Sequence, residues 1–181
     1  MSKSTRSKVY GLLAEYDSAR GIYKACEKVR DAGYTCWDAH TPFPVHGLDG
    51  AMGLKNSPLP WIVFGMGMTG ALFGITLQYW TSAVDYPLII ASKPLFSYQA
   101  FVPVTFELGI LFSAFGAVFG MLGLNKLPTL YHALFKVPKF ARATDDRFFI
   151  SIEARDPNYD PGRTRKLLEG TGAVSVEEVE D

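Results

Sequence analysis

The chain has 181 residues, of which 48% are hydrophobic, and it carries 18 basic and 18 acidic side chains. Lysines and arginines number 8, 1 and 9 in residues 1–56, 57–124 and 125–181, and acidic residues number 6, 2 and 10 in the same three ranges. The charges therefore lie at the two ends, and the middle is apolar. Without a basic excess or a basic stripe, nucleic acid is excluded as a partner.

The first 56 residues predict a strand, a helix and a second strand. The apolar run VYGLLAE (9–15) is typical of a buried strand. A helix follows, because Asp17 or Ser18 suits its N-cap and Gly33 the position after its C-cap. Its apolar residues recur at helical spacing, at Ile22, Ala25, Cys26 and Val29. Residues 34–39 (YTCWDA) then predict the second strand.

Two apolar runs, residues 61–80 and 101–124, are each long enough to cross a bilayer. At about 1.5 Å per residue, twenty residues span roughly the 30 Å of a hydrocarbon core. The first run has no charge and has Trp61 and Trp80 at its ends, where an aromatic belt would lie. We therefore predict two transmembrane helices, in preference to two buried helices of a soluble core.

Both predicted membrane helices carry small residues on one face. In lipid there is little hydrophobic drive between helices, so close approach over small residues is a main source of attraction. The spacing is GxxxG at Gly70/Gly74 and again at Gly116/Gly120. We expect these faces to pack against protein, either against each other or against a partner; the full stripes are Gly67, Gly70 and Gly74, and Gly109, Ser113, Gly116 and Gly120.

The last third repeats the strand, helix, strand order. Residues 147–154 (RFFISIEA) predict a strand, and Asp160 with Pro161 predicts a capped helix that ends at Gly170. Val174 and Val176 alternate with polar residues in a final strand, and we expect the acidic tail after it (177–181) to be solvated and frayed. The connector 127–140 mixes apolar side chains with lysines, which fits a segment on the membrane surface or a loop on the soluble part.

Two strand–helix–strand halves in series predict a ferredoxin-like βαββαβ fold. The transmembrane hairpin would be an insertion between strands 2 and 3. The expected organisation is therefore an α+β soluble domain formed by residues 1–56 and 127–181, with the hairpin at 57–126.

Charge flanking the membrane runs predicts the orientation. Five basic residues lie near the membrane ends on the terminal side (Lys55, Lys126, Lys136, Lys139 and Arg142), against Lys93 alone in the connecting loop. We expect both termini to be cytoplasmic in a two-pass protein of the bacterial inner membrane. Residues 1–8 are polar and basic without an apolar run behind them, so no cleavable signal peptide is expected.

Few residues are candidates for chemistry. Cys26 and Cys36 form neither a CxxCH haem site nor a four-cysteine cluster site. Glu107 is the sole ionisable residue in either apolar run, and it fits either a proton-carrying role or a structural carboxylate near a helix start opened by Pro103. The three histidines, His40, His46 and His132, are expected to be separate polar groups on loops.

Several long motifs resemble the D subunit of bacterial alternative complex III, a respiratory quinol oxidoreductase. The resemblance runs nearly end to end, through YGLLAEYDS (10–18), DAHTPFPVHGLD (38–49), LPWIV (59–63), LQYWTSAVDYPL (77–88), FVPVTFEL (101–108), LYHALF (130–135) and RFFISIEARDP (147–157).

That resemblance implies a subunit with two membrane helices, a cytoplasmic domain and no redox centre. It implies that haem c and iron–sulfur clusters belong to partners: a multihaem cytochrome, an iron–sulfur protein, and a polytopic quinol-binding subunit with its paralogue. The chain would then be a non-catalytic membrane scaffold for these subunits, and Glu107 would be a candidate for a role in proton movement. The alternative is a freestanding membrane-anchored ferredoxin-like module that binds a ligand or regulates a transporter.

Overall fold

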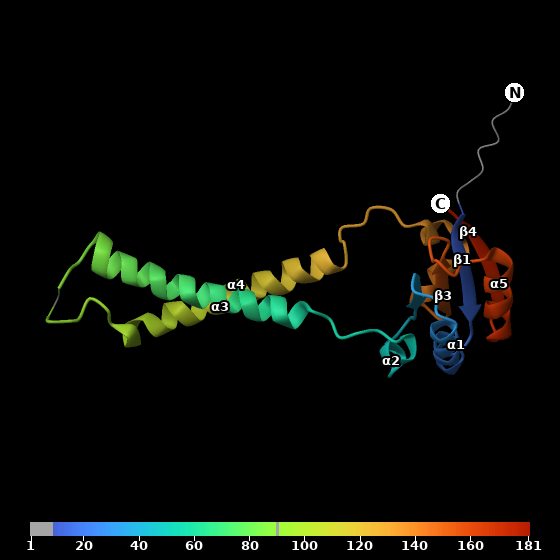
Figure 1. Ribbon diagram of the computed structural model, residues 1–181, viewed down its shortest axis with the longest axis horizontal. Coiled ribbons are helices and arrows are strands. Elements are labelled where there is room, and N and C mark those ends of the chain that lie inside the picture. Colours follow the sequence, from blue (N-terminus) through green and yellow to red (C-terminus); the bar gives the residue numbers. More distant parts are fainter. Residues whose placement is uncertain (1–8, 90) are drawn as a thin grey trace, which may run out of the picture. The chain divides into compact units, whose positions relative to one another are not determined.

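The computed structural model describes residues 9–89 and 91–181, which form two compact units (Figure 1). Unit 1 contains the described residues of Met1–Lys55 and Tyr131–Asp181, and unit 2 is Asn56–Leu130. The absence of a signal peptide, expected from residues 1–8, concerns residues outside the described ones.

Unit 1 is built on a four-stranded antiparallel sheet in the order β2-β3-β1-β4. Its strands are β1 (Val9–Tyr16), β2 (Trp37–His40), β3 (Phe148–Glu153) and β4 (Ser175–Glu180). Leu12 of the central strand β1 lies opposite Ile152 of β3 and Glu178 of β4. Every pair joins one strand from before residue 56 with one from after residue 130, so neither half of unit 1 has a sheet of its own.

Local signals fix the two main helices of unit 1, α1 (Ala19–Asp31) and α5 (Pro161–Gly170). The Ser18 hydroxyl accepts a hydrogen bond from the Gly21 amide at 3.2 Å, and the Asp160 carboxylate accepts one from the Arg163 amide at 2.7 Å. Gly33 follows the C-cap of α1 at φ 82°, a left-handed conformation that favours glycine. A short helix, α2 (Leu48–Met52), follows β2.

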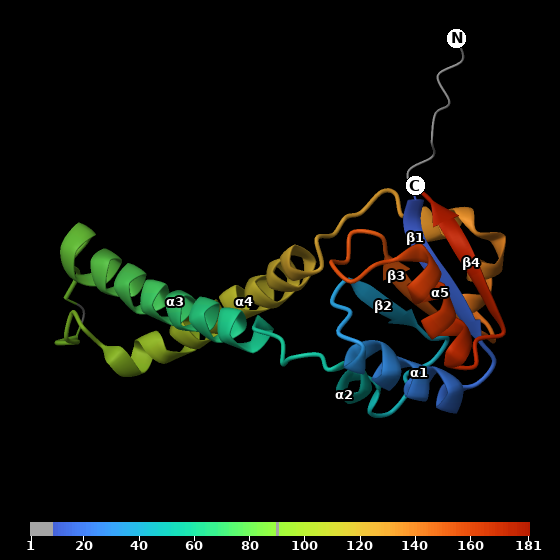
Figure 2. The same cartoon turned by 45° about the vertical axis from the view of Figure 1, so that its right-hand side comes forward.

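Helices α1 and α5 lie on the same face of the sheet (Figure 2), and each face has its own apolar core. On one face α1 and α5 pack against alternate residues of the strands, as strand geometry requires; this cluster includes Leu12, Ala14, Tyr16, Ile22, Val29, Ile150, Ile152 and Leu168. The other face is covered by two 3₁₀ helices, η2 (Ala133–Lys136) and η3 (Pro138–Thr144). Its cluster consists of Leu13, Phe149 and Val179 from the sheet with Ala133, Leu134, Phe140 and Ala143.

The prediction of a frayed acidic tail is wrong. Strand β4 continues to Glu180, and within it Val179 is only 1% exposed. Val179 belongs to the cluster under η2 and η3, so burial of one apolar side chain holds the surrounding acidic residues in the strand.

Strand β2 begins three residues later than predicted, at Trp37. The Asp156 carboxylate accepts hydrogen bonds from the amides of Thr35 and Cys36, both at 2.6 Å, so these two groups are not available to the sheet.

Unit 2 is a helical hairpin of α3 (Leu59–Tyr79) and α4 (Tyr98–Leu124). A π-helical turn, η1 (Trp80–Asp85), extends α3 toward the connecting loop. Both helices begin two or three residues before the predicted starts. Pro103 lies inside α4, in its second turn, and lacks the amide that would donate to the Gln99 carbonyl oxygen.

Candidate interaction surfaces

The two small-residue stripes of unit 2 face each other across α3 and α4. A methyl group added at Gly74 would stand 3.0 Å from the Cα of Thr105, and one added at Gly116 would stand 2.9 Å from the Cβ of Met66. At Gly70 the added group would meet the carbonyl oxygen of Leu108. Real Cβ contacts are longer than this, so the close approach of the helices depends on glycine at these positions.

The stripes are not packed equally tightly. A methyl group at Gly120 would lie 2.8 Å from Leu59, whereas one at Gly109 would keep an ordinary 3.6 Å from the Gly67 carbonyl oxygen. Gly67 itself faces the Ser113 hydroxyl. The seam is therefore tight at Gly67, Gly70, Gly74, Gly116 and Gly120, and looser at Gly109.

A polar contact fastens the seam near the connecting loop. The Gln78 side-chain amide donates to the Phe101 carbonyl oxygen at 3.1 Å and to the Thr105 hydroxyl at 3.3 Å. Such bonds between helices matter in lipid, where no water competes for the donor. Sequence reasoning missed Gln78, although its signal was present: it is the one side-chain amide in the first apolar run.

Beside the seam lies an apolar groove of about 570 Å³. Its floor is formed by small residues of both helices, including Gly67, Ala71, Gly109 and Ser113, and its rim by aromatic and aliphatic side chains.

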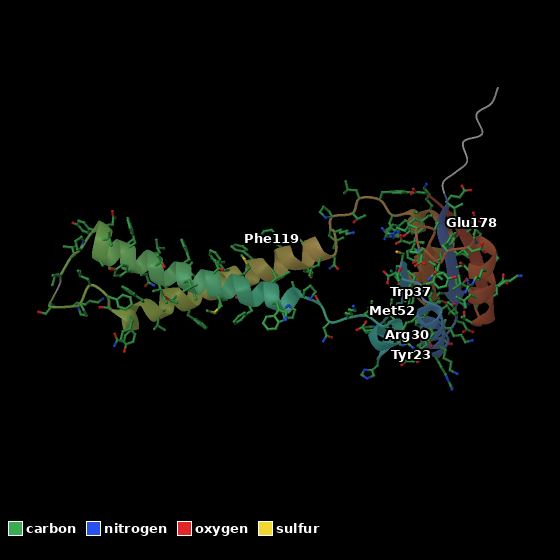
Figure 3. The ribbon with its side chains drawn as sticks, in the orientation of Figure 1. Tyr23, Arg30, Trp37, Met52, Phe119 and Glu178 are labelled. Carbon is green, nitrogen blue, oxygen red and sulfur yellow. The ribbon has the colours of Figure 1, made fainter. Side chains whose placement is uncertain are left out.

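The outer faces of both helices are apolar and exposed within this chain. Each contains a strongly apolar window of which only 11% is buried, and both helices are long and apolar enough to cross a membrane. Phe119, on α4, is 66% exposed (Figure 3). A core helix of a soluble protein would be mostly buried, so these faces require lipid or a partner protein.

Glu107 is exposed on α4 and lies in the third turn of that helix. The sequence-based interpretation of a carboxylate near a helix start is wrong in its geometry, because the helix begins at Tyr98 and Pro103 lies inside it. Glu107 is thus about 13 Å along the axis from the first residue, at 1.5 Å per residue. The helix dipole favours a negative charge in the first turn, and Glu107 lies beyond that turn.

Two of the three histidines are not isolated loop residues, which corrects the prediction. His40 is the last residue of β2, and its Nε2 lies 3.3 Å from the Ser151 hydroxyl. His132 Nε2 lies 3.3 Å from the Tyr10 hydroxyl.

Burial lowers the pKa of His40; the Asp38 carboxylate opposes this effect, and His132 adds to it. Both rings contact phenylalanines of the connector, His40 with Phe140 and His132 with Phe135.

The connector after α4 packs on the sheet of unit 1 through one side only. Ala133 and Leu134 are 2% and 1% exposed, whereas the adjacent Phe135 is 80% exposed. Of the two interpretations that the sequence allowed, packing on the soluble part therefore describes the inner side chains of η2 and η3. The outer side chains remain uncovered within the chain.

No group of three or more histidine, cysteine or acidic side chains that could hold a metal ion occurs among residues 9–89 and 91–181. Cys26 is buried, and burial raises the pKa of its thiol to about 12, so it is not a reactive thiolate near neutral pH.

These features define a class of protein: an α/β unit joined to a hairpin of two apolar helices that pack through glycine. The chain matches the family described as alternative complex III, ActD subunit, over residues 10–178, and it belongs to that family. It is accordingly a subunit of alternative complex III, a complex of the respiratory chain. No curated protein matches the chain.

Proposed function

We propose that this chain is a non-catalytic, cofactor-free integral membrane subunit that scaffolds the quinol-oxidising part of alternative complex III. The observation that carries the proposal is the contrast between the two sides of the helical hairpin. Its inner seam is closed over glycine, whereas its outer faces are apolar and exposed. A closed seam makes the hairpin a preformed unit, and its outer faces are available to lipid and to neighbouring subunits.

The expected neighbours follow from family membership and chemistry. A polytopic quinol-binding subunit and its paralogue would supply transmembrane helices for the outer faces of α3 and α4. The multihaem cytochrome and the iron–sulfur subunit would hold the haem c groups and clusters. In this arrangement the chain contributes apolar surface and position to the complex, and its partners contribute the redox chemistry.

We propose a ferredoxin-like fold for unit 1, with the hairpin inserted between β2 and β3. The strand order β2-β3-β1-β4 and the pairing of strands across the two halves support this proposal. The insertion would leave both termini in the cytoplasm of a two-pass protein of the inner membrane, as the distribution of basic residues favours.

A deletion tests the cofactor-free scaffold directly. The complex is purified through a tag on its cytochrome subunit from cells with and without this chain. We expect a lower yield of intact complex without the chain, and unchanged haem and iron–sulfur signals per remaining cytochrome. Loss of a haem or cluster signal from complexes that lack only this chain would show that the chain holds a redox centre. That result would overturn the proposal.

A further inference from the structure

The outer side of η2 presents an aromatic patch that we define as Tyr131, Phe135 and Lys136. Phe135 is 80% exposed and Tyr131 is 54% exposed. The two residues between them that face inward, Ala133 and Leu134, are almost fully buried against the sheet. The direction of Phe135 is therefore fixed by its neighbours in a tight 3₁₀ turn, and its exposure belongs to an ordered surface.

Neighbouring side chains hold the patch in place. The ring centre of Phe135 lies 5.9 Å from that of Phe140 and 6.3 Å from that of His132, both in edge-on arrangements. The Lys136 ammonium lies 5.3 Å from the centre of the Tyr131 ring. Aromatic and cation–π contacts of this kind favour the observed ring positions over alternatives. The patch is thus preorganised before any partner arrives.

The charges around the patch largely cancel. Lys139 forms an ion pair with Glu177, and Arg142 forms one with Asp146. Lys136 remains, and it is in range of the carboxylates of Glu180 and Asp181. A surface of this kind does not attract anions strongly, so its partner must be recognised by apolar contact with a polar margin.

We propose that the aromatic patch docks on the lipid headgroup layer, with the Phe135 and Tyr131 rings inserted and the Lys136 ammonium among the phosphates. The proposal rests on the proposed function, in which α4 crosses the membrane. Aromatic rings with an adjacent lysine are the side chains that membrane interfaces favour.

Chain length favours lipid as the partner. Helix α4 ends at Leu124 and Tyr131 follows seven positions later, a reach of at most about 25 Å. The chain itself therefore keeps the membrane surface within reach of the patch. Because the surrounding charges cancel, docking should occur on zwitterionic lipid nearly as well as on anionic lipid.

The test uses the full chain in vesicles of phosphatidylcholine that contain a spin-labelled lipid quencher. Cys36 is replaced by serine, and a fluorophore is attached to cysteine in Lys136→Cys. This variant removes the lysine of the patch but leaves the Tyr131 and Phe135 rings, whose insertion is tested. Two further sites serve as controls: Phe119→Cys on α4, and Val174→Cys, which is 57% exposed on unit 1. We expect strong quenching by lipid at 119, clear quenching at 136 and little at 174. Adding Phe135→Ser should reduce quenching at 136 to the level at 174 and leave 119 unchanged.

Three outcomes overturn the account, and they are distinct. Weak quenching at 119 would mean that α4 is not in lipid, so the proposed function fails. Strong quenching at 119 with equal, weak quenching at 136 and 174 would overturn only the proposal that the aromatic patch docks on lipid. In the purified whole complex, loss of lipid quenching at 136 together with protection from aqueous iodide would show that a protein subunit covers the patch, and would also overturn it.

Discussion

Asp156 shows how a single buried carboxylate organises the edge of unit 1. It is 4% exposed and accepts hydrogen bonds from the amides of Thr35, Cys36 and Asn158. Burial alone would raise the pKa of Asp156, but the three backbone donors outweigh it and the pKa is lowered from its ordinary value of 3.8. The ionised form therefore stabilises the fold.

We expect Asp156→Asn to lower the free energy of unfolding of unit 1 by roughly 2 to 3 kcal/mol, because charge-assisted hydrogen bonds to buried amides are lost. A lowered pKa in the folded state stabilises the fold above the unfolded pKa. The difference between wild type and variant should therefore be full at pH 7 and should shrink below about pH 4. Chemical unfolding of the full chain in detergent, followed at several pH values, measures it. The exposed Asp17→Asn is the matched control, and an equal loss of stability in both variants would contradict this account.

Glu107 lies too far along α4 to be explained as a helix-start carboxylate. In the proposed complex it needs water or a polar partner from another subunit, because a charge in hydrocarbon is costly. We expect Glu107→Gln to preserve assembly, quinol oxidation and proton release, since glutamine retains hydrogen-bonding capacity. Proteoliposomes that hold the variant complex, checked for full subunit content, measure the last two. A fall in proton release at full subunit content would instead assign Glu107 a part in proton movement.

At the scale of elements, the glycine seam joins α3 and α4 into one hairpin. We expect Gly70→Leu with Gly116→Leu to separate the helices and to remove most of the chain from the complex on native gels. Membrane insertion, measured by resistance to alkaline extraction, should persist because apolar length is unchanged. Gly65→Leu is the matched control, since nothing lies within 4 Å of a methyl group added there. An intact complex with both seam glycines replaced would show that the seam is not needed for assembly.

The elements predicted from the sequence were those with local signals. Capping by Ser18 and Asp160, and the apolar periodicity of α1, gave helices whose ends differ little from the structure. The errors arose where distant residues decide. Strand β4 continues because Val179 is buried under the connector, and β2 starts late because Asp156 takes two of its amides. Neither contact can be recognised from the sequence of the strand that it affects.

The candidate surfaces were predictable to a similar extent. The small-residue stripes were visible as spacing in the sequence, whereas their closeness to each other, and the groove beside them, depend on the crossing of two helices. The contacts of His40 with Phe140 and of His132 with Tyr10 could not be foreseen, because they join residues more than 99 positions apart in the sequence.

At the scale of the whole molecule, the distribution of basic residues predicts cytoplasmic termini. The test is Ser92→Cys in a Cys36→Ser background, treated with an impermeant maleimide. Cys26 can remain, because burial raises its thiol pKa to about 12 and keeps it unreactive. We expect labelling at 92 in intact spheroplasts, and labelling at a Val174→Cys control only after lysis. Protection of position 92 in intact cells would reverse the orientation.

Membership of a family of complex subunits makes assembly the central claim about this chain. The most direct measurement is purification in mild detergent through a tag on this chain, followed by haem absorbance spectra and mass spectrometry of the eluate. We expect a haem c spectrum, together with polytopic membrane subunits and an iron–sulfur protein in fixed ratio to the tagged chain. Recovery of the tagged chain alone, without haem and without polytopic partners, from membranes that contain those subunits would contradict it.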